Sequence, residues 1–163
     1  MRLKKPRIAP LADADMNANH REALAAQFGR GNVYNIFRTL ARAPDAYRAF
    51  MKWGGYILSD KNSLAPRERE IVILRTGFNW KSGYEWAQHV RIGKQCGLTD
   101  VEIEAIKEGP LSPDWSAIDS AMIRATDELT SDGFITDRTW AELAPLTEKQ
   151  RMDLVMTVGQ YTQ

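Results

Sequence analysis

Apolar residues along the chain recur three and four positions apart, the spacing that places them on one face of an α-helix. The run Ile71–Leu74 is the main exception, because its β-branched residues would also suit a strand. The charged turn before that run and the length of its segment favour a helix. The pattern predicts helices over 19–28, 33–40, 44–57, 67–78, 82–96, 99–109, 118–133, 136–144 and from 147 onward. About eight helices with short connections predict an all-α fold in a single domain over residues 1–163.

The two ends of the chain carry weaker patterns. Residues 1–18 contain Pro6 and Pro10 and little periodicity, so we predict an extended N-terminal arm on the surface or on a neighbouring subunit. The last helical pattern reaches Gln163 without a stop signal. We expect either that the polypeptide is shortened or that its last residues pack against something.

Composition excludes several classes of function. The net charge is +1, which gives no surplus to attract nucleic acid or an anionic membrane. No apolar run is long enough for a membrane span, and the basic N-terminus lacks the apolar segment of a secretory signal. The one cysteine, Cys96, cannot form an internal disulfide. We therefore predict a cytoplasmic protein without nucleic-acid or membrane partners.

Candidate chemistry gathers at the start of the helix predicted over 82–96. Ser82, Glu85 and His89 are three and four residues apart, so they share one helix face. Ser82 and Glu85 also match a capping box, as do Thr99 and Glu102 at the next helix. A carboxylate beside an imidazole can orient the ring, and histidine exchanges protons near neutral pH. Burial would raise the pKa of Glu85, so either side chain could hold the working proton.

The plain alternative is a chance pair, because glutamate and histidine stand four residues apart on many helices. Two neighbouring aromatic residues, Tyr84 and Trp86, argue against a simple solvated face. The other histidine, His20, lies in an ordinary charged segment. These surroundings favour a functional role for the pair Glu85 and His89.

The stretch from Leu64 to Ile103, and above all its YEWAQH segment, resembles the carboxymuconolactone decarboxylase family. The resemblance covers roughly residues 33–163. That family shares its fold with the alkylhydroperoxidase D proteins. The resemblance implies an alkylhydroperoxidase D-like helical domain in which a helical hairpin supports the active site. It also implies a homo-oligomer, commonly a trimer or hexamer.

The peroxidase branch of this fold carries the motif E-x-x-C-x-x-C-x-x-x-H. On this chain the glutamate falls at Asn79, the cysteines fall at Ser82 and Glu85, and the histidine is retained as His89. A thiol peroxidase needs a thiolate nucleophile and a resolving thiol, and both positions lack sulfur here. Cys96 lies two turns beyond His89 and cannot replace the pair. Peroxidase chemistry at a C-x-x-C pair is therefore excluded.

The remaining resemblance is to the decarboxylase-like branch, in which glutamate and histidine do acid–base work. It implies Glu85 and His89 as catalytic residues, with Ser82 in support. The implied substrate is a small organic acid or lactone from aromatic-compound breakdown. No metal or organic cofactor is expected, because the electron sink lies in the substrate. Glu85 and His89 alone would supply only two ligands, and no H-E-x-x-H motif is present.

Three further side chains are candidates for substrate binding: Trp86, Tyr84 and Arg75. Arg75 suits a substrate carboxylate through paired hydrogen bonds. The alternative for Arg75 is an ion pair with Glu70 or Glu68, or a bridge between subunits. The mixed-charge turn Arg67–Glu70 is interpreted as a solvated helix start without a function.

Two other functions stay open. The protein could be a non-catalytic oligomeric ligand-binding module, which a closed apolar pocket with Glu85 facing solvent would favour. It could also be an alkylhydroperoxidase-type peroxidase that uses Cys96 alone. Cys96→Ser would then remove peroxide consumption.

Overall fold

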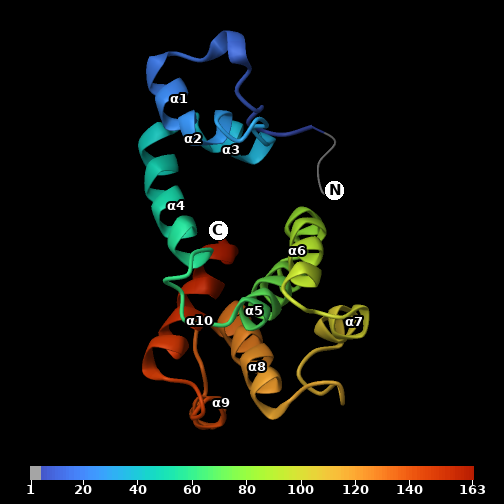
Figure 1. The fold of residues 1–163 in the computed structure, drawn as a ribbon. Helices are drawn as coiled ribbons and strands as arrows, with labels where there is room; N and C mark the ends of the chain where they lie inside the picture. The colour runs from blue at the N-terminus through green and yellow to red at the C-terminus, as the bar shows by residue number, and fades with distance from the viewer. Residues whose placement is uncertain (1–4) are drawn as a thin grey trace. The chain divides into compact units, whose positions relative to one another are not determined.

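The computed structural model describes residues 5–163, and that part of the chain is helical without strands (Figure 1). This confirms the all-α prediction, with ten α-helices in the described residues where about eight were expected. The residues group into two compact units, Met1–Tyr56 and Ile57–Gln163. No helix of the described residues is long and apolar enough to cross a membrane.

The first unit is built from short helices. Its elements are the 3-10 helix η1 (Asp13–Asp15), α1 (Ala18–Ala23), α2 (Ala25–Phe28), α3 (Asn35–Leu40) and α4 (Pro44–Ile57). The helix expected over 19–28 is broken at Leu24, whose backbone joins α1 to α2.

The predicted N-terminal arm is only partly extended. Its residues 1–4 lie outside the described residues, and residues 5–12 carry no helix. Leu11 and Met16 are buried and pack with Leu24 and Val33 in the core of their own unit. The second half of the expected arm is thus part of this core, because its two apolar side chains find partners there.

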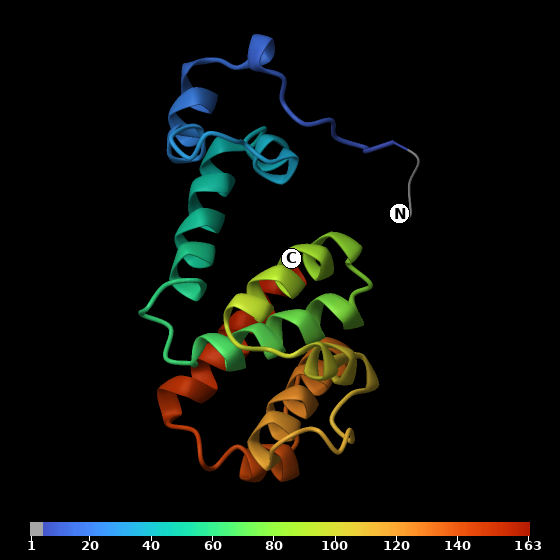
Figure 2. The ribbon, with the colours of Figure 1, turned by 45° about the vertical axis from the view of Figure 1, so that its right-hand side comes forward.

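The second unit carries the candidate chemistry. Its helices are α5 (Pro66–Asn79), α6 (Gly83–Gln95), α7 (Asp100–Glu108), α8 (Ala117–Asp132), α9 (Asp137–Glu142) and α10 (Glu148–Thr162). Helix α5 packs against α6, α7, α8 and α10, so it is the central helix of this unit (Figure 2).

The central position of α5 explains its run of apolar residues. A helix surrounded by others is apolar on all sides, and Ile71, Val72, Ile73 and Leu74 are all buried. Val72 joins one apolar cluster with residues of α8 and α10, and Ile71 and Leu74 join another with residues of α7 and α8. The strand alternative for this run is therefore wrong.

The charged turn at the start of α5 is not the solvated segment that the sequence pattern suggests. Arg67 donates to Glu102 of α7, and its Nη1 donates to Asp119 Oδ1 of α8 at 3.0 Å. Asp119 is buried. Burial alone would raise the pKa of Glu102, but hydrogen bonds from Thr99 and Arg67 outweigh burial and lower it. The arginine therefore ties three helices together.

We predict that Arg67→Met lowers the free energy of unfolding by about 2 kcal/mol or more, because it leaves two half-buried or buried carboxylates without their cation. Urea denaturation followed by circular dichroism measures the change. The matched control is Arg138→Met on α9, whose side chain is 79% exposed and pairs with Glu142. The control should cost less than about 0.5 kcal/mol. Equal losses in both variants would contradict this account.

Candidate active site

The tight connection between α5 and α6 sets the geometry of the site. Lys81 takes the left-handed conformation, with φ of +56°, and the backbone N–H of Ser82 donates to Gly77 O at 2.8 Å. A Cβ atom on Gly77 would lie 3.4 Å from the Cβ of Glu85, an ordinary van der Waals distance, so α6 lies against α5 at this point. The two helices form the hairpin that the family resemblance implies.

This hairpin places His89 of α6 opposite Glu70 of α5. His89 Nδ1 lies 2.7 Å from Glu70 Oε2, and the two residues are 5% and 1% exposed. An ionised carboxylate can only accept a hydrogen bond, so opposite an ionised Glu70 the His89 ring is in a form in which Nδ1–H is the donor. The bond fixes the ring orientation and leaves Nε2 as the nitrogen available for proton exchange.

Glu85 faces the other nitrogen of the same imidazole. Its Oε2 lies 3.7 Å from His89 Nε2, across one turn of α6. Burial raises the pKa of Glu85, and the charge of His89 offsets part of that increase. The predicted pair of Glu85 and His89 is therefore brought together, with Glu70 as a third member.

A side chain from the last turn of α10 closes the cluster. The ring of Tyr161 contacts the His89 ring at a centroid distance of 5.0 Å and an interplanar angle of 89°, an edge-to-face arrangement. Burial and the carboxylates of Glu70 and Glu85 raise the pKa of the Tyr161 hydroxyl, so this hydroxyl is neutral at physiological pH. The last turn of α10 therefore packs against the imidazole of α6.

The second carboxylate oxygen of Glu70 is not used in the bond to His89. Glu70 Oε1 is buried and has no hydrogen-bond partner in residues 5–163. A buried acceptor without a partner is uncommon and is found at functional sites. Within the described residues, no group of three or more histidine, cysteine, aspartate or glutamate side chains is arranged to hold a metal ion.

Ser82 has a structural position at the start of α6. Its hydroxyl accepts from the backbone N–H of Glu85 at 3.5 Å, as an N-cap. The capping box expected here is only half formed, because the Ser82 N–H donates to Gly77 and leaves the Glu85 carboxylate free to face His89. The capping box at Thr99 and Glu102 is complete. A catalytic role for Ser82 stays a prediction.

Trp86, one of the two aromatic candidates of α6, contacts side chains of α5 and α7. Trp86 contacts the Phe78 ring at a centroid distance of 5.9 Å and lies under the Lys107 ammonium at 5.2 Å. Tyr84 is 46% exposed. Substrate binding by Trp86 and Tyr84 stays a prediction.

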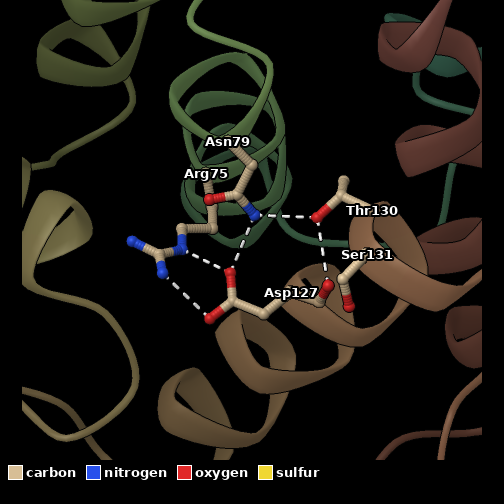
Figure 3. A pocket seen from close by; sticks show the side chains of 5 residues that line it. All are labelled: Arg75, Asn79, Asp127, Thr130 and Ser131. Atoms are coloured by element: carbon tan, nitrogen blue, oxygen red, sulfur yellow. Dashed lines mark hydrogen bonds and ion pairs between the residues drawn. The ribbon is translucent and has the colours of Figure 1, made fainter.

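Arg75 is engaged within the second unit. Its Nε and Nη2 donate to the two carboxylate oxygens of Asp127, at 2.6 and 2.9 Å, as Figure 3 shows. Its Nη1 donates to the backbone oxygens of Ile106 and Lys107. The alternative of an ion pair is therefore correct in kind, but the partner is Asp127 and not Glu70 or Glu68. A role in substrate binding would require Arg75 to leave this arrangement.

A polar depression of about 360 Å³ lies beside that ion pair. Its lining residues are Arg75, Asn79, Asp127, Thr130 and Ser131 (Figure 3). The Asn79 amide donates to both Asp127 and Thr130 at 2.8 Å. The side chain at the motif's first glutamate position thus joins α5 to α8.

Cys96 follows the last turn of α6 and is half-buried. Burial and the carboxylate of Glu70 raise the pKa of its thiol, although Arg69 opposes the shift. A raised pKa lowers the thiolate fraction, and the thiolate is the form that attacks a peroxide. This environment opposes a peroxidase that depends on Cys96.

The sequence pattern does not point to Glu70 or Tyr161. Glu70 stands in a run of four charged residues, and the available signal was its place directly before the apolar run Ile71–Leu74. A charge at the edge of a fully buried helix segment needs a buried partner. Tyr161 gives no local signal, because its contact with His89 depends on how α10 packs.

A model described as the carboxymuconolactone decarboxylase family matches residues 44–128, which is more than half of the chain. The matched range includes Glu70, Glu85 and His89 but not Tyr161. No curated protein sequence matches the chain.

Several solved structures share the fold. One is an uncharacterised peroxidase-related protein with an alkylhydroperoxidase AhpD core from Ralstonia eutropha JMP134, with 21% identity, a TM-score of 0.76, and 96% of this chain and 86% of that chain covered. Another is a cysteine-to-alanine variant of the debrominase Bmp8 with 2,3,4-tribromopyrrole, with 14% identity, a TM-score of 0.76, and 97% and 85% covered. A third, from Agrobacterium tumefaciens, is a protein of unknown function and a candidate antioxidant defence protein AhpD, with 18% identity, a TM-score of 0.69, and 76% and 85% covered. These likenesses confirm the predicted alkylhydroperoxidase D-like fold.

The raised pKa of Glu85 predicts a pH-dependent effect of Glu85→Gln on stability. A carboxyl group with a raised folded-state pKa stabilises the fold below its unfolded pKa and loses that contribution as the pH rises through the folded value. The variant should therefore gain stability over the wild-type chain as the pH rises from about 4 to about 8. Urea denaturation at a series of pH values measures the difference. A difference that stays constant or reverses over this range would contradict the assignment.

Proposed function

The chain belongs to the carboxymuconolactone decarboxylase family, and we propose that it is a cofactor-free acid–base enzyme acting on a small organic acid or lactone. The proposed reaction is a decarboxylation or a related proton transfer on a lactone, in aromatic-compound catabolism. The observation that supports the proposal is the buried imidazole of His89, held by Glu70 on one nitrogen and faced by Glu85 on the other.

Each side chain of this group has a distinct role in the proposal. Glu70 accepts a hydrogen bond from Nδ1–H and orients the ring, so His89 exchanges a proton with the substrate through Nε2. Glu85 lies beside Nε2, and its raised pKa suits a carboxyl group that passes a proton to and from the imidazole. Glu85 and the protonated His89, which lie in different environments, can then pass one proton between them and on to the substrate.

In the proposed decarboxylation, the bond between the substrate carbon and its carboxylate breaks and carbon dioxide leaves. The electron pair of that bond enters the conjugated carbonyl of the substrate and forms a dienolate. The protonated His89 then gives its Nε2 proton to a carbon of the dienolate, and solvent or Glu85 restores the proton. The substrate supplies the electron sink, so no metal or organic cofactor is needed.

The geometry favours an enzyme over the binding module. A binding module with a closed apolar pocket would have Glu85 in solvent, whereas Glu85 lies beside His89 with a side chain only 24% exposed. The raised pKa of Cys96 argues against the peroxidase alternative. We also propose, from the family alone, a cytoplasmic homo-oligomer, a trimer or hexamer, whose partners are a small-molecule substrate and no nucleic acid or membrane.

We predict that His89→Gln and Glu70→Gln each reduce turnover at least about 100-fold, because each removes the oriented proton donor. The assay follows carbon dioxide release and deuterium incorporation by NMR, in D₂O, over a panel of carboxylated lactones that includes carboxymuconolactone. His20→Gln is the matched control, since it changes the other histidine and glutamine can still accept the capping bond from Asn17.

The control should keep wild-type turnover. Full turnover in either site variant would contradict the proposal. The wild-type chain could instead bind members of the panel without releasing carbon dioxide or incorporating deuterium. That result would favour the binding module.

A further inference from the structure

Tyr161 contacts the reactive imidazole but has no part in the proton transfers described above. It lies on α10, outside the residues matched by the family model, and its ring stands perpendicular to the His89 ring. The contact is therefore a feature of this chain that the motif on α5 and α6 does not contain.

The last turn of α10 is anchored to the same hairpin that carries the site. Trp80, which caps the end of α5, donates its indole N–H to Thr162 Oγ1 at 3.3 Å. Thr162 in turn donates to the backbone oxygen of Val158 at 2.8 Å. Tyr161 is adjacent to this anchor, so its ring is held in place from the same connection that positions Glu85.

We propose that Tyr161 is a positioning residue whose ring holds the His89 imidazole with Nδ1 toward Glu70 and Nε2 toward Glu85. Its consequence for catalysis rests on the function proposed above, whereas its effect on the imidazole does not.

The His89 imidazole needs a second contact because the histidine side chain can rotate. The last torsion of histidine is broad, and one hydrogen bond at Nδ1 still allows the ring to rock about that bond. An aromatic ring at 5.0 Å and 89° occupies the volume into which the imidazole would turn. A reversed ring would present a carbon atom to Glu70 and leave the buried carboxylate without its donor.

The hydroxyl of Tyr161 is not assigned this role. Burial and the two carboxylates of the site raise its pKa, so it adds no charge to the site at neutral pH. If the ring alone positions His89, phenylalanine can replace Tyr161 and an aliphatic residue of similar size cannot.

The test compares Tyr161→Phe with Tyr161→Leu through the reactivity of His89 toward diethyl pyrocarbonate. The chain has two histidines, so His20 is an internal reference in every sample, and peptide mass spectrometry separates the two. We expect the His89 rate, relative to that of His20, to rise about tenfold in the leucine variant, a change of the size that corresponds to one aromatic pair. The phenylalanine variant should rescue the wild-type rate. Phe134→Leu, at an exposed aromatic residue of the same unit, should match the wild-type chain.

A second readout, on a substrate that the wild-type chain turns over, compares the effects of the substitution on kcat and on KM. The leucine variant should lose kcat by about tenfold with little change in KM, because it misplaces the proton donor and not the substrate. If the leucine variant is unfolded by circular dichroism, Tyr161→Met supplies the variant without a ring.

Unchanged His89 reactivity in a folded variant without the ring would overturn the proposal. Equal effects of phenylalanine and leucine would also overturn it, since they would assign the role to the hydroxyl. If His89→Gln keeps full turnover while the reactivity of His89 still depends on the ring, the proposed function fails and the positioning by Tyr161 stands.

Discussion

The hydrogen bond between Glu70 and His89 is the interaction on which the rest of the site depends. A carboxylate that is 1% exposed would be costly to bury without a donor, and the imidazole is the donor that the fold supplies. The bond crosses the α5–α6 hairpin and selects the nitrogen that faces Glu85. Residues of α5 pack in apolar clusters beside the site, and the turn at Lys81, closed by the hydrogen bond from Ser82 N–H to Gly77 O, joins the two helices.

The spacing of residues along the sequence could predict which side chains share a face of one helix, but it could not predict contacts between helices. It placed Glu85 and His89 on one face of α6, and it identified Ser82 and Thr99 as helix starts. Glu70 was not found, because its neighbours in the sequence are charged and its burial follows from the other helices that pack around α5. The partner of Arg75 was not found for a similar reason, since Asp127 lies on a helix much later in the chain.

The position of the sulfur atom distinguishes this site from a thiol redox site. The side chains at the two cysteine positions of the peroxidase motif are a helix cap and a carboxylate with a raised pKa. The one thiol, Cys96, lies near Glu70, where its pKa is raised. The same scaffold therefore holds a capping hydroxyl and a carboxyl group where the peroxidase motif holds thiols, and a fold alone does not fix a reaction.

The most direct test of this account is the protonation of the His89 ring nitrogens at neutral pH, observed by long-range ¹H–¹⁵N NMR on the labelled chain. We predict a proton on Nδ1 that exchanges slowly with water and is lost as a protected signal in Glu70→Gln, with the fold retained. An unprotonated Nδ1, or a protected Nδ1 signal that is unchanged in Glu70→Gln, would contradict the claim that this hydrogen bond organises the site.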